Sequence, residues 1–232
     1  MKNYSKAVED ISMSEKREMY NILRNYFEET SFDRFNADLL EKERAIFIAE
    51  GDKIVGFSTF VTIKIEVEKE SVYVVFSGDT IVEKEYRKSS GLAIEVAKYF
   101  NNIQERFLGK RVYYLLTTKG WRTYKVLPFF FNEFYPRVDR QMPKEIKKVM
   151  DIFCQKKYTH NYDSKKNLIV ASGKQQRIRS ENSYDADYPA RDNRDIDFFF
   201  ESNKGYLNGD ELVCIASLEK ENINKKLKRV GR

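Results

Sequence analysis

The stretch that decides the fold is Asp79-Thr-Ile-Val-Glu-Lys-Glu-Tyr-Arg-Lys-Ser-Ser-Gly-Leu-Ala93, in which a strand ends, a basic turn follows and a helix begins. The first turn of a helix carries free backbone N–H groups and the positive end of the helix dipole. Small residues in the turn let a ligand approach the main chain, and Arg87 and Lys88 add positive charge. The stretch therefore predicts an anion site suited to a diphosphate. The structural alternative is that Ser89 or Ser90 caps the helix while Gly91 eases its packing.

The segments before this stretch predict two helices and then a run of strands. Ser12-Met-Ser-Glu15 has the form of a capping box, and apolar residues follow it at helical spacing. A second short helix is expected from about Phe32 to Lys42. Strands over 45–49 and 54–60 flank a glycine-containing turn, which indicates a hairpin. The next strand, about 72–82, contains Ser77-Gly78-Asp79, and a glycine inside a strand often marks a bulge.

The segments after the stretch continue the alternation of helices and strands. The expected elements are a helix over 92–107, a strand over 111–117 and a helix from Lys119 that Pro128 kinks or ends. A helix over 143–155 and strands over 168–171 and 211–218 follow, with a long loop over about 172–194 between the strands. The sum is an α/β fold.

Composition limits the classes of function that the chain can have. Its 232 residues include 41% hydrophobic residues, 17 Phe and 15 Tyr, which is enough for a packed core. One histidine and two cysteines are too few for a zinc-finger cluster. Cys154 and Cys214 are expected to be free thiols in a reducing compartment. The absence of an apolar leader or of a long apolar run predicts a cytoplasmic protein without a membrane span.

The order of elements around Asp79–Ala93 resembles the GCN5-related N-acetyltransferase (GNAT) superfamily. The signature of that family, Q/R-x-x-G-x-G/A, is similar to Lys88-Ser-Ser-Gly91-Leu-Ala93, with Lys in the first place. Ile81-Val-Glu-Lys-Glu-Tyr86-Arg87 resembles the approach to the signature, without its usual proline and with a loop one residue longer. The resemblance covers roughly residues 14–130.

The resemblance implies a GNAT-like, mixed and mostly antiparallel twisted sheet flanked by helices. It further implies one domain over 1–232, with a core over 14–130 and an extension with closing strands over 137–232. It implies that main-chain groups of Ile81 and Val82 bind the pantetheine arm of CoA. The diphosphate would then be held by Arg87, Lys88, Ser89, Ser90, Gly91, Leu92 and Ala93.

A GNAT-type reaction needs a base for the amine and an acid for the leaving thiolate. In the family, an acidic residue on the fourth strand and a tyrosine on the fourth helix often serve. Asp79 and Tyr124 are the residues of this chain that the resemblance places there. Each has a structural alternative, a turn-facing aspartate and a core aromatic. His160 is a second candidate base, and a lone loop histidine is more often incidental.

Three further features each leave two interpretations open. The aromatic run Trp121–Tyr135 either packs in the core or lines a tunnel for an acyl chain longer than acetyl, where each buried methylene contributes about 0.8 kcal/mol. The basic tail 219–232 is a solvated terminus or a nucleic-acid contact, and nucleic acid is not expected. The last feature is an acidic cluster, whose spacing favours a solvated loop over a calcium site: Asp185, Asp187, Asp192, Asp195 and Asp197.

The function predicted from the sequence is N-acyl transfer from an acyl thioester, acyl-CoA or acyl carrier protein, to an amine, without a metal. The acceptor is an amine of a peptide, a protein lysine or ornithine side chain, or a small molecule, and the acyl group is acetyl or a fatty acyl group. The alternatives are an acetyl-CoA-dependent small-amine acetyltransferase and a non-catalytic CoA-binding module.

Overall fold

A mixed sheet of eight strands forms the centre of the described part of the chain. The computed structural model describes residues 1–179, 193–225 and 227. Within them the strand order is β1-β3-β4-β5-β6-β10-β8-β7, and each neighbouring pair is antiparallel except the parallel pair β5–β6. The strands are β1 (Lys2–Ala7), β3 (Arg44–Glu50), β4 (Lys53–Val67), β5 (Glu70–Val82), β6 (Arg111–Thr118), β7 (Tyr162–Asp163), β8 (Leu168–Ile169) and β10 (Glu211–Ser217). The predicted fold class, a mostly antiparallel mixed sheet flanked by helices, is confirmed.

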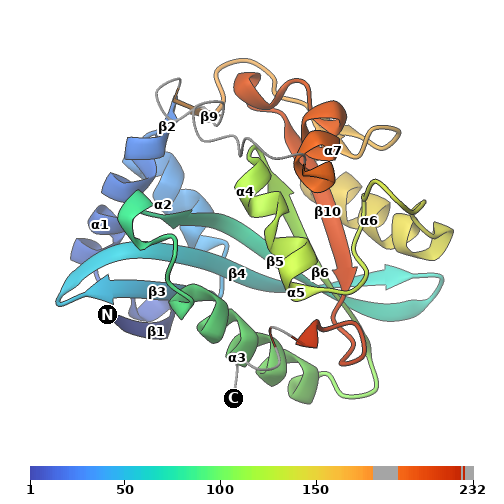
Figure 1. Cartoon of the computed structure of the whole chain (residues 1–232), viewed down its shortest axis with the longest axis horizontal. Helices are drawn as coiled ribbons and strands as arrows, with labels where there is room; N and C mark the ends of the chain where they lie inside the picture. Colours follow the sequence, from blue (N-terminus) through green and yellow to red (C-terminus); the bar gives the residue numbers. More distant parts are fainter. Residues whose placement is uncertain (180–192, 226, 228–232) are drawn as a thin grey trace.

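Helices cover both faces of this sheet. One face packs against α3 (Gly91–Arg106), α4 (Trp121–Tyr124), α5 (Val126–Phe130) and α7 (Arg194–Ser202). The opposite face packs against α1 (Met13–Tyr26), α2 (Phe32–Leu40) and α6 (Lys144–Lys157). Figure 1 shows α3, α4 and α5 over the near face and α6 behind the sheet.

The alternation of side chains along the strands explains the two cores. In β5, Val75 belongs to the α3 core, whereas Val74 and Phe76 belong to the α6 core. Successive residues of a strand point to opposite faces, so a strand buried on both sides is apolar throughout. The predicted capping box at the start of α1 is present, with Ser12 and Glu15 bonded reciprocally.

Two departures from a regular sheet occur in β5. Ser58 lies opposite Thr80 and Phe60 lies opposite Ser77, so Thr59 alone faces two residues, Gly78 and Asp79. This is the bulge that the internal glycine predicted. The pairing of β5 with β6 ends at Ser77 and Leu116. Beyond that point β5 follows β4 and β6 follows β10, so the two strands diverge.

Some elements were not predicted from the sequence. The polar N-terminus forms the edge strand β1, and α7 begins at Arg194 where a loop was expected. A two-residue strand within the expected loop, β9 (Arg177–Ile178), pairs with β2 (Phe27–Glu28). Residues 180–192, which include Asp185, Asp187 and Asp192, lie outside the described residues.

Two further observations concern the cysteines and the helices. Cys154 and Cys214 are both free and both buried. Across the described residues, none of the helices combines the length and the apolar character that crossing a bilayer requires.

The aromatic side chains in and just after α5 differ in burial, and a pair of substitutions tests this difference. Phe131 is 1% exposed, and its ring lies 5.6 Å from that of Tyr114 and 6.0 Å from that of Phe100. Phe131→Ala should lower the free energy of unfolding by about 3–5 kcal/mol. Phe129 is 39% exposed, so Phe129→Ala should cost less than about 1 kcal/mol. Equal losses in denaturant unfolding would contradict the assignment.

Candidate functional site

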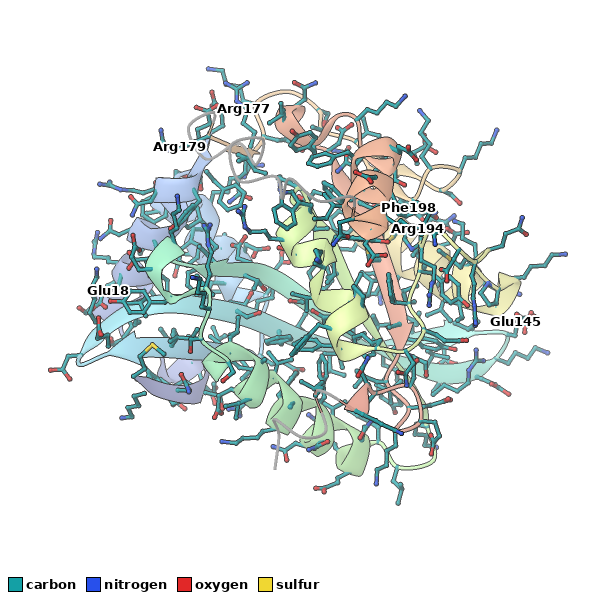
Figure 2. All side chains as sticks on the ribbon, viewed as in Figure 1. Glu18, Glu145, Arg177, Arg179, Arg194 and Phe198 are labelled. Carbon is teal, nitrogen blue, oxygen red and sulfur yellow. The ribbon has the colours of Figure 1, made fainter. Side chains whose placement is uncertain are left out.

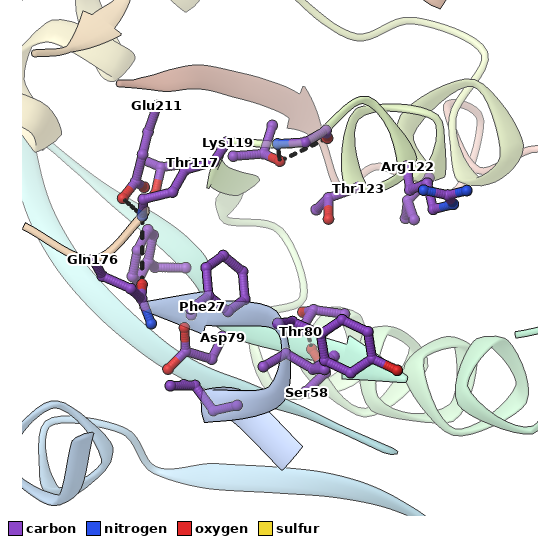
Figure 3. A pocket seen from close by; sticks show the side chains of 18 of the residues that line it. Phe27, Ser58, Asp79, Thr80, Thr117, Lys119, Arg122, Thr123, Gln176 and Glu211 are labelled. Atoms are coloured by element: carbon purple, nitrogen blue, oxygen red, sulfur yellow. Dashed lines mark hydrogen bonds and ion pairs between the residues drawn. The ribbon is translucent and has the colours of Figure 1, made fainter. Parts of the chain in front are cut away.

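A large cavity occupies the place where β5 and β6 diverge. Its volume is about 1120 Å³, slightly above the range of about 300–1,000 Å³ that is usual for ligand pockets. The end of β5, the first turns of α3, helices α4 and α5, and the segment after α6 all contribute to its lining. Figure 3 shows part of this lining, with polar side chains gathered near Asp79.

Asp79 lies in the β-bulge and lines the cavity, and a buried lysine packs against the neighbouring Gly78. A Cβ atom on Gly78 would lie 2.6 Å from Cε of Lys42 and 2.5 Å from Oγ1 of Thr59, so only glycine fits there. The side chain of Lys42 is fully buried, and its ammonium binds the carboxylate of Asp38 at 2.8 Å. The stem of Lys42 therefore occupies the space that a side chain at position 78 would need.

Asp79 is the carboxyl group of the cavity without a partner. It is half-buried, and within the described residues it makes no hydrogen bond or ion pair, whereas Asp38 and Glu211 each pair with a lysine. Burial is the main cause that raises the pKa of Asp79 to about 6, and the nearby Asp38 carboxylate adds to it. Lys119 and Lys42 oppose the shift. A carboxylate with a pKa close to neutrality can exchange a proton under ordinary conditions.

A second polar group forms the opposite wall of the cavity. Lys119, at the end of β6, forms an ion pair with Glu211 at the start of β10. Its ammonium also lies 3.5 Å from Oε1 of Gln176. Figure 3 shows this group and Asp79 on the same cavity. The two diverging strands thus place a base candidate and a fixed cation on one space.

The first turn of α3 lies at the other end of the cavity. The first hydrogen bond within the helix joins the N–H of Ile94 to the carbonyl of Ser90. The N–H groups of Leu92 and Ala93 come before it and therefore have no acceptor within the helix. Both of these residues line the cavity. The side chain of Ser90 does not cap the helix, and that of Ser89 accepts from the N–H of Gly91 at 3.1 Å.

The structure brings most of the predicted donor-binding residues to the cavity. Ile81, Val82, Arg87, Ser89, Leu92 and Ala93 line it together with Asp79. Arg87 donates from Nε to the carbonyl of Val82 at 3.1 Å, and its guanidinium lies over the ring of Tyr26.

Three predicted residues of the turn do not line the cavity. Lys88 and Ser90 are exposed beside it. Gly91 is buried, and a Cβ atom there would lie 2.2 Å from Oδ1 of Asn3 in β1. Gly91 therefore lets α3 begin close to the edge strand, which is the packing alternative considered for it.

The structure does not bring Tyr124 to the cavity. Its side chain is fully buried, and its hydroxyl donates to the carbonyl of Pro136 at 2.9 Å. Its ring packs against Phe134 and Phe199, the latter from α7. Because Tyr124 does not line the cavity and its hydroxyl is bonded to Pro136, its position does not suit the predicted role of the acid.

A different tyrosine lines the cavity. Tyr158 follows α6 and lies close to Thr117, at the point where β6 leaves β5. A phenol with the ordinary pKa of tyrosine already holds its proton at neutral pH, and burial raises the pKa of the Tyr158 hydroxyl further. His160 is exposed at the rim of the same cavity.

Several cavity residues could not be found from local sequence patterns. Asp38 comes from the first fifth of the chain, and Gln176 and Glu211 come from the last quarter. No motif links these positions, since only the fold brings them together. Within the described residues, no group of three histidine, cysteine or acidic side chains is arranged to hold a metal.

Comparisons with known proteins give distant structural similarity alone. No family model and no curated relative matches the chain. A probable N-acyltransferase from Enterococcus faecalis is 13% identical, with a TM-score of 0.44 over 60% of this chain and 38% of its own. An Escherichia coli GNAT family N-acetyltransferase in complex with CoA is 16% identical, with a TM-score of 0.38 over 51% of this chain and 64% of its own.

A third similar structure is an aminoglycoside acetyltransferase from a soil metagenomic sample, solved with sisomicin. It is 10% identical, with a TM-score of 0.41 over 61% of this chain and 91% of its own. The chain spans less than two thirds of the length of the first two structures. Similarity at these scores does not determine an activity.

The raised pKa of Asp79 predicts a pH-dependent cost to stability. The pKa of this carboxyl group is about 6 in the folded chain and about 3.8 in the unfolded chain. The unfolded chain therefore releases the proton more readily, and the free energy of unfolding falls as the pH rises from 4 to 6. Asp79→Asn removes this loss. Its free energy of unfolding, relative to wild type, should therefore rise by up to about 3 kcal/mol between pH 4 and pH 7 and then stay constant.

This difference is measured by denaturant unfolding of both proteins at each pH. Asp52→Asn, in the exposed β3–β4 turn, serves as the control and should give a flat difference. A difference between Asp79→Asn and wild type that does not change with pH would contradict the raised pKa.

Proposed function

We propose that the protein is an N-acyltransferase that moves an acyl group from a thioester of CoA to an amine. The observation that carries the proposal is Asp79, an unpartnered carboxyl group with a pKa of about 6 at the opening between β5 and β6. An amine is protonated at neutral pH and must lose a proton before it attacks, and a base of this kind can take it.

The donor site of the proposal lies between Asp79 and the first turn of α3. The free N–H groups of Leu92 and Ala93 and the positive end of the helix suit a diphosphate. The divergence of β5 from β6 leaves a strand edge that can bind an extended amide-containing arm such as pantetheine. Arg122 and Lys125 line the same end of the cavity and add positive charge. The resemblance of the turn to the GNAT signature supports this placement.

Along β5, the main-chain N–H and C=O groups of successive residues point alternately toward β4 and toward the opening. Glu83 donates its N–H to the carbonyl of Val55, so β5 turns the main-chain groups of Ile81 toward β4. The main-chain groups of Thr80 and Val82 therefore point toward the opening. There the carbonyl of Val82 already accepts a hydrogen bond from Nε of Arg87. In the proposal, Thr80 joins Val82 in binding the arm.

The chemistry assigned to the chain uses two groups that transfer protons. Asp79 takes one proton from the acceptor ammonium, and the neutral amine then attacks the thioester carbonyl. A carbon–nitrogen bond forms, the carbon–sulfur bond breaks, and the thiolate leaves. The phenol of Tyr158 gives its proton to the thiolate and regains one, through water, from the nitrogen that becomes the amide, while Asp79 releases its proton to solvent. No covalent intermediate on the protein is needed.

The length of the acyl group remains an open part of the proposal. Trp121, Phe129 and Phe130 line the cavity, whereas Phe131 and Phe134 pack in the core. Three rings offer an apolar surface to an acyl chain, and they equally suit the apolar part of a short donor. The donor thioester is therefore proposed as acyl-CoA, from acetyl upward.

The role of Asp79 is tested by steady-state acyl transfer with Asp79→Asn. Loss of a general base should lower kcat/KM by about 10²–10⁴-fold. The ratio of wild-type to variant activity should rise with pH through about 6 and then level off, because wild-type Asp79 must be ionised to act. Taking the ratio removes the ionisation of the amine itself.

Asp52→Asn is again the matched control and should retain wild-type kcat/KM. A non-catalytic CoA-binding module would bind CoA equally in wild type and Asp79→Asn and would show no turnover in either. Turnover that Asp79→Asn leaves unchanged would remove Asp79 from the mechanism.

A further inference from the structure

A short segment from the last third of the chain crosses one end of the cavity. It comprises residues 173–179 and is called the strap here. Within it, β9 pairs with β2, so that Ile178 lies opposite Phe27 and Arg177 lies opposite Glu28. Arg177 donates from Nε to Glu28 at 2.6 Å. Figure 2 labels Arg177 and Arg179 beside this pair of strands.

Further contacts hold the strap on the N-terminal helices. The N–H of Arg179 donates to the carbonyl of Tyr26 at 3.0 Å, and its Nε donates to the carbonyl of Arg24 at 2.8 Å. Arg34, in α2, donates to the carbonyl of Lys174 at 3.3 Å. These bonds join segments that are about 150 residues apart in the sequence.

The strap also reaches the opposite wall of the cavity. The amide oxygen of Gln176 accepts from Lys119, which is itself ion-paired with Glu211. Just before the strap, the N–H of Ala171 donates to the carboxylate of Asp210 at 2.8 Å. The strap is therefore anchored on both sides of the space between β6 and α2.

Three side chains of the strap line the cavity at the end where Asp79 lies. Gln175, Gln176 and Ile178 line the cavity, together with Phe27 from the paired strand. The first turn of α3 lies at the other end. A donor bound at α3 would leave the space between Asp79 and the strap for the acceptor.

We propose that the strap turns the acceptor end of the cavity into a walled chamber for a small primary amine with a polar group at its far end. This inference rests on the proposed function. In it, the reacting nitrogen lies at Asp79, and the polar group contacts Gln176 and the Lys119–Glu211 pair. The class of acceptor is therefore short diamines and amino alcohols, and lysine side chains on the surface of a folded protein are excluded by the strap.

The cavity volume fits this assignment. At about 1120 Å³ the cavity exceeds the usual range for one drug-sized ligand, so it has room for a donor arm and a small second molecule. In the proposal, the strap, anchored on β2 and α2, stands between Asp79 and a lysine carried by a folded protein.

An acceptor panel tests the proposal on the wild-type protein. Acetyl-CoA and a medium-chain acyl-CoA are supplied as donors. The acceptors are diamines and amino alcohols of two to six carbons, an unstructured lysine-containing peptide, and a folded protein rich in surface lysines. The small amines should show a kcat/KM at least tenfold above that of the folded protein. Equal rates per amino group would overturn the proposal.

Gln176→Ala tests whether the strap contacts the acceptor. Loss of one hydrogen bond should raise the KM for the amine about five- to tenfold. The KM for the donor and the slow hydrolysis of the thioester without amine should not change. Gln141→Ala, at an exposed position outside the cavity, is the control and should change neither. A Gln176→Ala protein with an unchanged KM for the amine, or with both KM values raised alike, would contradict the assignment.

The double substitution Arg177→Ala with Arg179→Ala removes two anchors of the strap. The lysine peptide should then gain activity relative to the small amines, provided that thermal melting shows a folded protein. If this variant does not fold, the wild-type panel still decides. An absence of transfer to every acceptor would overturn the proposed function and this inference together, whereas rapid transfer to the folded protein would overturn the inference alone.

Discussion

The cavity depends on the point at which β5 stops pairing with β6. Up to Ser77 and Leu116 the two strands form a regular parallel ladder. If the ladder continued, the backbone groups of β5 and β6 would satisfy each other and no space would exist between them. Divergence leaves strand-edge groups in need of partners, because unpaired buried backbone groups are costly. Arg87 supplies one partner at Val82, and the remaining edge is available to a ligand.

The bulge at Gly78 and Asp79 links this divergence to the charge distribution of the cavity. The buried stem of Lys42 crosses Gly78, and its ammonium neutralises Asp38. Lys119 similarly neutralises Glu211. Of the three acidic side chains that line the cavity among the described residues, Asp79 alone has no paired cation, so no ion pair offsets the rise in its pKa that burial causes. Asp38 and Glu211 are each neutralised by a lysine, so Asp79 is the carboxylate that would act as the base in acyl transfer.

The sequence was informative where a local pattern determines the structure. The capping box at Ser12, the bulge at Gly78 and the helix that begins at Gly91 each follow from residues close together in the chain. The orientation of Tyr124 could not be predicted, because it depends on the aromatic residues of α7, about 70 positions later. The strap could not be predicted either. Its two-residue strand is too short to show alternating polar and apolar residues, and it is a strand only because it pairs with β2.

We propose above all that the space between β5, β6 and α3 binds a thioester of CoA. Native mass spectrometry of the protein with an equimolar ladder of CoA, acetyl-CoA and medium- to long-chain acyl-CoAs tests it most directly. The account predicts that one molecule of a CoA ester is retained per chain, and that Ala93→Glu, which places a negative charge at the first turn of α3, abolishes the retention. Retention of no CoA species by the folded wild-type protein would contradict the account.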